Sequence, residues 1–97
     1  MIKVFLFSGS GVGVNGLAGL EKALRSSSLI EFVKGDRLSR VSLSGFDVLI
    51  LPGGDSARKL YRDNPRVDGS VVRELVGKGL CVIGICSGDV LVREDVL

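Results

Sequence analysis

The sequence predicts a single α/β domain of three layers, in which a parallel sheet lies between helices. Two observations predict this fold. Short, almost wholly apolar runs, typical of strands buried on both faces, alternate with segments whose apolar residues recur at helical spacing. Strands that alternate with helices are joined by right-handed crossovers, which make the strands parallel and place helices on both faces. In such sheets, ligands bind at the carboxyl ends of the strands.

The first quarter of the chain predicts a strand and a helix. Residues Ile2–Phe7 form the first apolar run. A glycine-rich turn follows, and Leu17, Leu20 and Leu24 then recur at helical spacing. Asn15 can cap this helix, because asparagine is a common N-cap residue, and the serines at positions 26–28 end it.

The middle of the chain predicts two further strands and leaves the segment between them open. Leu29–Val33 and Phe46–Leu51 are expected as the second and third strands. Leu38–Ser44 fits either a strand or a loop, because its alternation of apolar and polar residues is weak. Asp55–Pro65 is expected as a polar connection with a helical turn around residues 57–61.

The last third predicts a helix and a fourth strand. Asp68 or Ser70 can cap the helix, and Glu74 and Lys78 are spaced as an i, i+4 ion pair. A fourth buried strand is expected over residues 80–85. The apolar residues at helical spacing in the helix are Val71, Val72, Leu75 and Val76.

Composition and charge exclude several functional classes. The 97 residues are 45% hydrophobic and carry a net charge of +2 without a run of like charges, which argues against nucleic-acid binding. No apolar run is long enough to cross a bilayer, and no signal-peptide pattern is present, so we expect a cytoplasmic protein. The chain has two cysteines and no histidine, and we therefore expect no zinc site and no cofactor. Cys81 is expected to pack as a small apolar residue.

The strongest candidate for a functional residue is Cys86. It lies in the pattern G-x-C-x-G, from Gly84 to Gly88, between the fourth strand and a last helix expected from Ser87. The α/β-hydrolases hold a nucleophilic serine at such a strand-to-helix corner. A thiol at a helix N-terminus has a lowered pKa, because the helix dipole stabilises the thiolate. The alternative is a buried cysteine in a tight turn.

A second glycine loop is expected beside Cys86, because the carboxyl ends of parallel strands lie at one edge of the sheet. Gly53 and Gly54 follow the third strand directly. Their backbone N–H groups could stabilise an oxyanion near the thiol, since glycine allows a close approach. Asp55 and Tyr61 follow the loop and are expected to project toward the same edge.

The turn after the first strand supports a competing prediction. Gly11, Gly13 and Gly16 match the pattern G-x-G-x-x-G between a strand and a helix. Asp36 lies 20 residues after Gly16, roughly where dinucleotide-binding folds place a ribose-binding acid. Nucleotide binding through this turn is therefore an alternative function.

Three segments in the observed order resemble the class I glutamine amidotransferase-like superfamily: residues 46–54, residues 84–88, and the turn formed by Ser8, Gly9, Ser10 and Gly11. The turn, together with Asp55 and Tyr61, most resembles the biotin–protein ligase N-terminal-like branch. The resemblance covers nearly the whole chain and implies a flavodoxin-like fold with a parallel sheet of strand order 2-1-3-4. It also implies that a small-molecule ligand is bound by Ser8, Gly9, Ser10, Gly11, Asp55 and Tyr61.

The resemblance further implies the roles at the reactive centre. Cys86 matches the nucleophile, and the oxyanion hole matches an amide of Gly53 or Gly54 together with the amide of Ser87. The superfamily takes its catalytic histidine and glutamate from later segments, and this sequence contains no histidine. Residues 1–97 therefore resemble the N-terminal half of the family domain.

These departures lead us to expect a catalytically incomplete domain, either a binding or regulatory module or half of a site that another chain completes. The alternative is an autonomous cysteine hydrolase or thiol enzyme with a base such as aspartate. Strand four would then lie at an edge of the sheet with unpaired backbone groups, so we expect a homo-oligomer or a second chain that pairs there.

Overall fold

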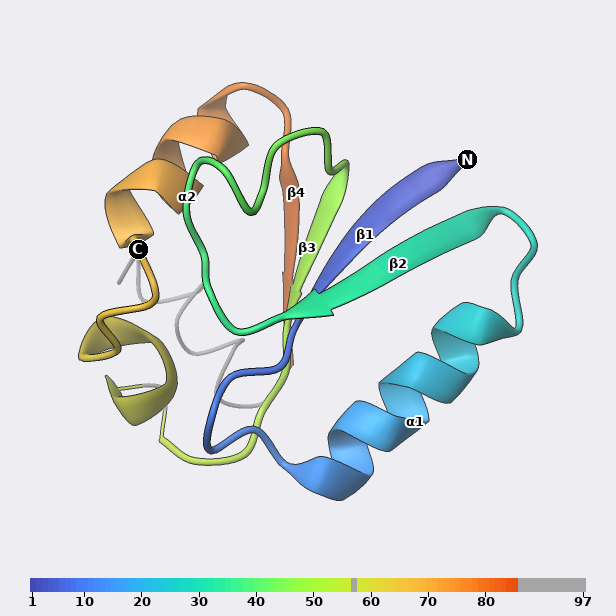
Figure 1. Ribbon diagram of the computed structural model, residues 1–97, viewed down its shortest axis with the longest axis horizontal. Coiled ribbons are helices and arrows are strands. Elements are labelled where there is room, and N and C mark those ends of the chain that lie inside the picture. The colour runs from blue at the N-terminus through green and yellow to red at the C-terminus, as the bar shows by residue number, and fades with distance from the viewer. Residues whose placement is uncertain (57, 86–97) are drawn as a thin grey trace.

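The computed structural model describes residues 1–56 and 58–85, and over these residues it confirms the predicted α/β fold. Its sheet has four parallel strands in the order β2-β1-β3-β4, as the sequence predicts (Figure 1). The elements in chain order are β1 (Ile2–Phe7), α1 (Val14–Arg25), β2 (Ile30–Gly35), β3 (Val48–Leu51), the short π-helix η1 (Arg58–Arg62), α2 (Gly69–Gly77) and β4 (Cys81–Gly84). The last helix expected from Ser87 lies outside the described residues.

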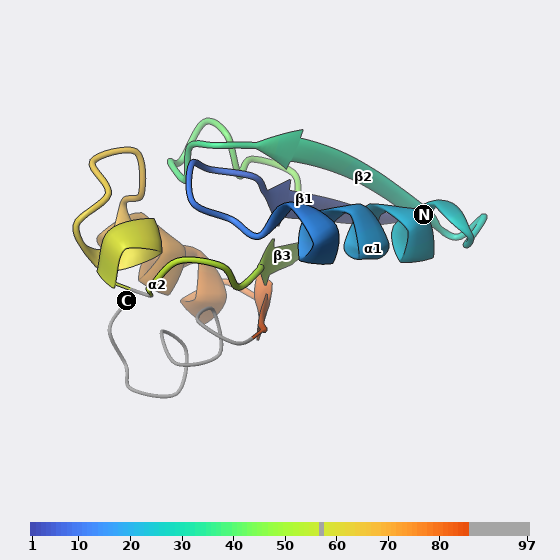
Figure 2. The same cartoon turned by 90° about the horizontal axis from the view of Figure 1, so that it is seen from below.

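Alternating side chains of β1 divide the core between the two faces of the sheet. Val4 and Leu6 pack with Leu24 of α1 on one face. Phe5 and Phe7 pack on the other face, which is covered by α2, η1 and the loop between β2 and β3 (Figures 1 and 2). All four of these β1 side chains are buried, as expected for a central strand of a parallel sheet.

The N-cap of helix α1 lies two residues before the predicted one. Gly13, in an extended conformation, is its N-cap, and Asn15 lies within the first turn, so the prediction that Asn15 caps this helix is wrong. The amide of Gly13 donates to the carbonyl of Gly53 at 3.0 Å, and this contact with a distant loop fixes where the helix begins. Lys22 and Arg25 lie in its last turn, where positive charge is favourable at a helix C-terminus.

The segment that fitted either a strand or a loop, Leu38–Ser44, is a loop with a buried apolar side. Leu38 and Leu43 are buried beneath it. The Leu38 amide donates to the carbonyl of Arg66 at 2.7 Å, and its carbonyl accepts from the amide of Asp68 at 2.8 Å. The loop is thus held by the segment that leads into α2, about thirty residues further along the chain.

Helix α2 confirms one predicted contact and corrects another. Asp68 is the N-cap and accepts a hydrogen bond from the amide of Val71 at 3.2 Å. Glu74 pairs with Arg40 of the β2–β3 loop, rather than with Lys78 as its spacing predicts. The hydrogen bond and charge of Arg40 lower the pKa of Glu74. This pair therefore links the loop to the helix.

The fourth strand corrects the prediction for Cys81. In register, Cys81 pairs with Val48 and Ile83 pairs with Ile50, which places both β4 residues on the α1 face of the sheet. Helix α1 contacts β2, at the opposite edge, and does not cover β4. Cys81 is therefore exposed instead of packed.

None of the described helices is long and apolar enough to cross a membrane.

Candidate functional site

The glycine loops that follow β1 and β3 join at the carboxyl edge of the sheet. Val12 and Gly54 form an antiparallel bridge. On either side of it, the Gly13 amide donates to Gly53 at 3.0 Å, and the Asp55 amide donates to Gly11 at 2.8 Å. The chain runs from β1 to one side of the sheet and from β3 to the other, so the loops meet at the topological switch point, where ligands of such sheets bind.

Glycine is required at two positions of this junction. Gly54 has φ +144°, and a Cβ built there would lie 2.3 Å from the carbonyl oxygen of Gly11 and 2.4 Å from the amide nitrogen of Gly13. Gly11 has φ +95° and occupies the third position of a turn closed by the Val12 amide and the Gly9 carbonyl at 3.2 Å. A larger residue at Gly54 would push the two loops apart.

The buried side chain of Tyr61, in η1, supports the glycine loop that follows β3. Its hydroxyl donates to the carbonyl oxygen of Pro52, and its ring packs at 5.2 Å from the ring of Phe7. The side chain is 1% exposed, and this burial raises the pKa of the phenol. The structure thus places Tyr61 in the core, where it supports the loop, whereas the sequence suggested that it projects toward a ligand.

The hydrogen bonds of the loop leave its amides available. The carbonyls of Pro52 and Gly53 accept from Tyr61 and Gly13 respectively. Within residues 1–56 and 58–85, the amides of Gly53 and Gly54 donate to no acceptor. A loop with occupied carbonyls and unoccupied amides is chemically suited to stabilise a negative charge.

An apolar cleft of about 290 Å³ adjoins this loop. Its lining comes from the loop, the start of α1 and the end of β4: Gly13, Gly16, Leu20, Pro52, Gly53, Gly54 and Ile85. Ile85 continues β4, since its amide donates to Leu51 at 3.0 Å. It directly precedes Cys86 in the sequence. Cys86 and Ser87 themselves lie outside the described residues.

A polar cleft of about 440 Å³ lies on the other side of the loop junction. It brings together four residues that the sequence singled out for binding, Gly9, Ser10, Gly11 and Asp55. Ser8 does not line this cleft; it is half-buried, and its amide donates to Gly35 at 2.8 Å.

Four charges of the polar cleft form two pairs within it, and a fifth, Asp63, pairs with Arg58 outside it. Arg66 lies 3.3 Å from Asp36, and Lys59 lies 4.0 Å from Asp55. The sequence did not indicate Lys59 and Arg66 as residues of a binding site. Arg66 follows Asp36 by 30 residues, and no local pattern indicates that they meet.

The glycines of the nucleotide-binding pattern do not line one cleft. Gly11 faces the polar cleft, whereas Gly13 and Gly16 line the apolar cleft. Asp36 does lie in the same cleft as Gly11, where it pairs with Arg66. In the described part of the chain, no group of three or more histidine, cysteine, aspartate or glutamate residues could hold a metal ion.

Comparison with known proteins gives one family. The model of the DJ-1/PfpI family matches residues 6–97. No curated protein and no solved structure matches the chain.

Proposed function

The chain belongs to the DJ-1/PfpI family, within the class I glutamine amidotransferase-like superfamily, and we propose that it acts through Cys86 as a reactive thiol at the loop junction. The observation that supports this proposal most is the junction itself. Two loops at the switch point are locked together beside Ile85, and the amides of Gly53 and Gly54 have no acceptor among the described residues.

In this proposal, the thiolate of Cys86 adds to a carbonyl carbon of the substrate. The electron pair of the carbonyl moves to its oxygen, and an amide of Gly53 or Gly54 and the amide of Ser87 stabilise the resulting oxyanion. Glycine at position 54 lets the loop approach closely enough for this role.

A cysteine–histidine relay needs a base that these 97 residues do not contain. We therefore propose that the domain binds a ligand or regulates a partner, or that a second chain supplies the histidine. The finer assignment to the biotin–protein ligase N-terminal-like branch is part of the same proposal. It is supported by the turn residues Gly9, Ser10 and Gly11, which share a cleft with Asp55.

The rate of alkylation by iodoacetamide, measured against pH, tests the thiol. The experiment uses the Cys81→Ser variant, because Cys81 is exposed and would otherwise react as well. We expect an apparent pKa for Cys86 below the ordinary thiol value of about 8.5. The Cys86→Ser variant, which retains Cys81, is the control for the contribution of Cys81 to alkylation of the unaltered chain. An apparent pKa for Cys86 at or above about 8.5 contradicts the proposal.

An autonomous thiol enzyme with an aspartate base is the second candidate. Asp55 is held at this edge by the hydrogen bond from its amide to Gly11, and it lines the polar cleft on the other side of the junction from Ile85. If Asp55 is the base, Asp55→Asn is expected to remove a step from the pH profile of Cys86 alkylation. An unchanged profile in Asp55→Asn rules out this base.

A further inference from the structure

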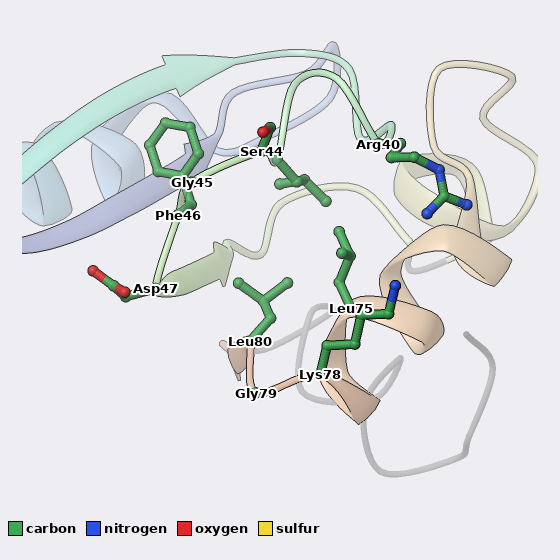
Figure 3. Close-up of a pocket in the computed structure, with 10 residues that line it drawn as sticks. Arg40, Ser44, Gly45, Phe46, Asp47, Leu75, Lys78, Gly79 and Leu80 are labelled. Atoms are coloured by element: carbon green, nitrogen blue, oxygen red, sulfur yellow. The ribbon is translucent and has the colours of Figure 1, made fainter.

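A third cleft lies at the amino ends of β3 and β4, opposite to the edge where Cys86 follows β4. Asp47 precedes β3 and Leu80 precedes β4, and the Cys81 amide donates to the carbonyl of Asp47 at 3.0 Å. The cleft opens between this pair, the β2–β3 loop and the last turn of α2 (Figure 3). Its volume is about 450 Å³, within the range of small-molecule sites.

The floor of this cleft is made of leucines. Leu43 and Leu80 are 2% and 8% exposed, and Leu75 packs against the same core. Figure 3 shows Leu75 and Leu80 pointing into a common space. We call it the leucine cleft. Leu43 and Leu80 are already buried, so an apolar group placed there would remove water mainly from the half-buried Leu75, without displacing any polar contact of the floor.

The rim of the leucine cleft has positive charge on one side. Lys78 extends beside Leu75, and Arg40 lies at the same side of the cleft, whereas Asp47 points away from the opposite side (Figure 3). Arg40 is already paired with Glu74. Lys78 forms no ion pair among the described residues.

Lys78 also decides the sign of the local field. It is the C-cap of α2, and the end of a helix carries the equivalent of about half a negative charge. The carboxylate of Glu74 also interacts with Lys78, but it is balanced by its ion pair with Arg40. The full positive charge of Lys78 therefore exceeds that of the helix end, so the rim can attract an anion. We infer that the leucine cleft binds a small carboxylate with an apolar body, its carboxylate at Lys78 and its body on Leu43, Leu75 and Leu80.

Two glycines allow this binding to be observed directly. Gly45 and Gly79 both line the cleft, at the entries to β3 and β4, and have φ values of +80° and +110°. Nuclear magnetic resonance titration with phenylacetate is expected to shift the amide resonances of Gly45 and Gly79 in a saturable way. The resonance of Gly19 in α1, which does not line the cleft, is expected to stay unchanged.

The matched variants are Lys78→Gln and Lys22→Gln, which remove one exposed positive charge each, at the cleft and on α1. We expect phenylacetate to bind about two- to five-fold more weakly to Lys78→Gln, as for an exposed ion pair, and equally well to Lys22→Gln. Phenylacetamide, which lacks the charge, and acetate, which lacks the apolar body, are both expected to bind more weakly than phenylacetate.

Three outcomes would overturn the inference. They are the absence of saturable shifts up to millimolar phenylacetate, an equal affinity of Lys78→Gln and the unaltered chain, and shifts at Gly45 and Gly79 that depend on protein concentration without any probe. The last would show that a second copy occupies the cleft. Because the titration does not involve Cys86, its result is independent of the proposed thiol chemistry.

Discussion

The hydroxyl of Tyr61 donates a hydrogen bond to the carbonyl oxygen of Pro52, which joins the buried side of η1 to the first residue of the loop that follows β3. The next residue of that loop, Gly53, accepts from Gly13 at the start of α1. A core tyrosine and a helix terminus thus hold the same loop from two directions. The position of the proposed oxyanion site depends on both contacts.

Removal of the Tyr61 hydroxyl is expected to destabilise the fold. Tyr61→Phe keeps the ring against Phe7 but leaves the carbonyl of Pro52 buried without its donor, at a cost of about 1–3 kcal/mol. Urea denaturation measures this change in the free energy of unfolding. Unchanged stability would mean that the hydrogen bond to Pro52 is replaced by another donor.

The same phenol predicts a dependence of stability on high pH. Burial raises the pKa of Tyr61, whereas in the unfolded chain a tyrosine ionises near pH 10, so its neutral form favours the folded state. This contribution is complete below about pH 10 and is lost as the pH rises further. Tyr61 is the only tyrosine of the sequence, so tyrosinate absorbance reports it alone. An ionisation near pH 10 in the folded protein would contradict the burial.

Gly54→Ala is expected to separate the two glycine loops. The added Cβ meets backbone atoms of Gly11 and Gly13, and φ +144° is unfavourable for alanine, so we expect a loss of about 1–3 kcal/mol or more. Gly16→Ala is the matched control, because its Cβ meets nothing within 4 Å and it lies within α1. There, alanine is expected to stabilise by about 0.5–1 kcal/mol. Equal changes in the free energy of unfolding for Gly54→Ala and Gly16→Ala would contradict the close contact of the two loops at Gly54.

The cap of α2 predicts a dependence of stability on low pH. The hydroxyl of Ser70 and then the amide of Val71 lower the pKa of Asp68. The stabilisation by ionised Asp68 is therefore present above its unfolded pKa of about 3.9 and is lost as the pH falls below it. We expect the stability difference between the unaltered chain and Asp68→Ala to shrink through this range. Glu31→Gln, at an exposed position on β2, serves as the control for loss of a carboxylate.

The open edge of β4 predicts association. Ile83 on this strand is 45% exposed. The backbone amides on the side of β4 that faces away from β3 have no strand partner in the described part of the sheet. We expect a dimer or larger assembly at tens of micromolar by light scattering, and expect Ile83→Lys to shift it toward monomer. Val33→Lys, at a residue of the other edge strand that is 49% exposed, is the matched control. A monodisperse monomer of the unaltered chain would contradict the expectation.

The sequence by itself determined the parts of this protein that depend on short-range pattern. The apolar run of Ile2–Phe7 and the spacing of Leu17, Leu20 and Leu24 specify a strand and a helix, because each signal lies within a few residues of the element that it defines. The cap at Asp68 was equally local. From these elements the chirality of crossovers predicted a parallel sheet and the edge where the glycine loops meet, whereas the strand order came from the family resemblance.

The tertiary structure alone decided which distant residues meet. Gly13 rather than Asn15 is the N-cap of α1, because the carbonyl of Gly53 accepts a hydrogen bond from its amide. Glu74 forms its ion pair with Arg40, 34 residues away in the sequence, rather than with Lys78. Tyr61, which the sequence suggested as a ligand contact, instead supports the loop, because its hydroxyl meets the carbonyl of Pro52 only in the folded chain. Side-chain spacing along the chain carries no information on such pairs, since their geometry exists only once helices and loops pack on the sheet.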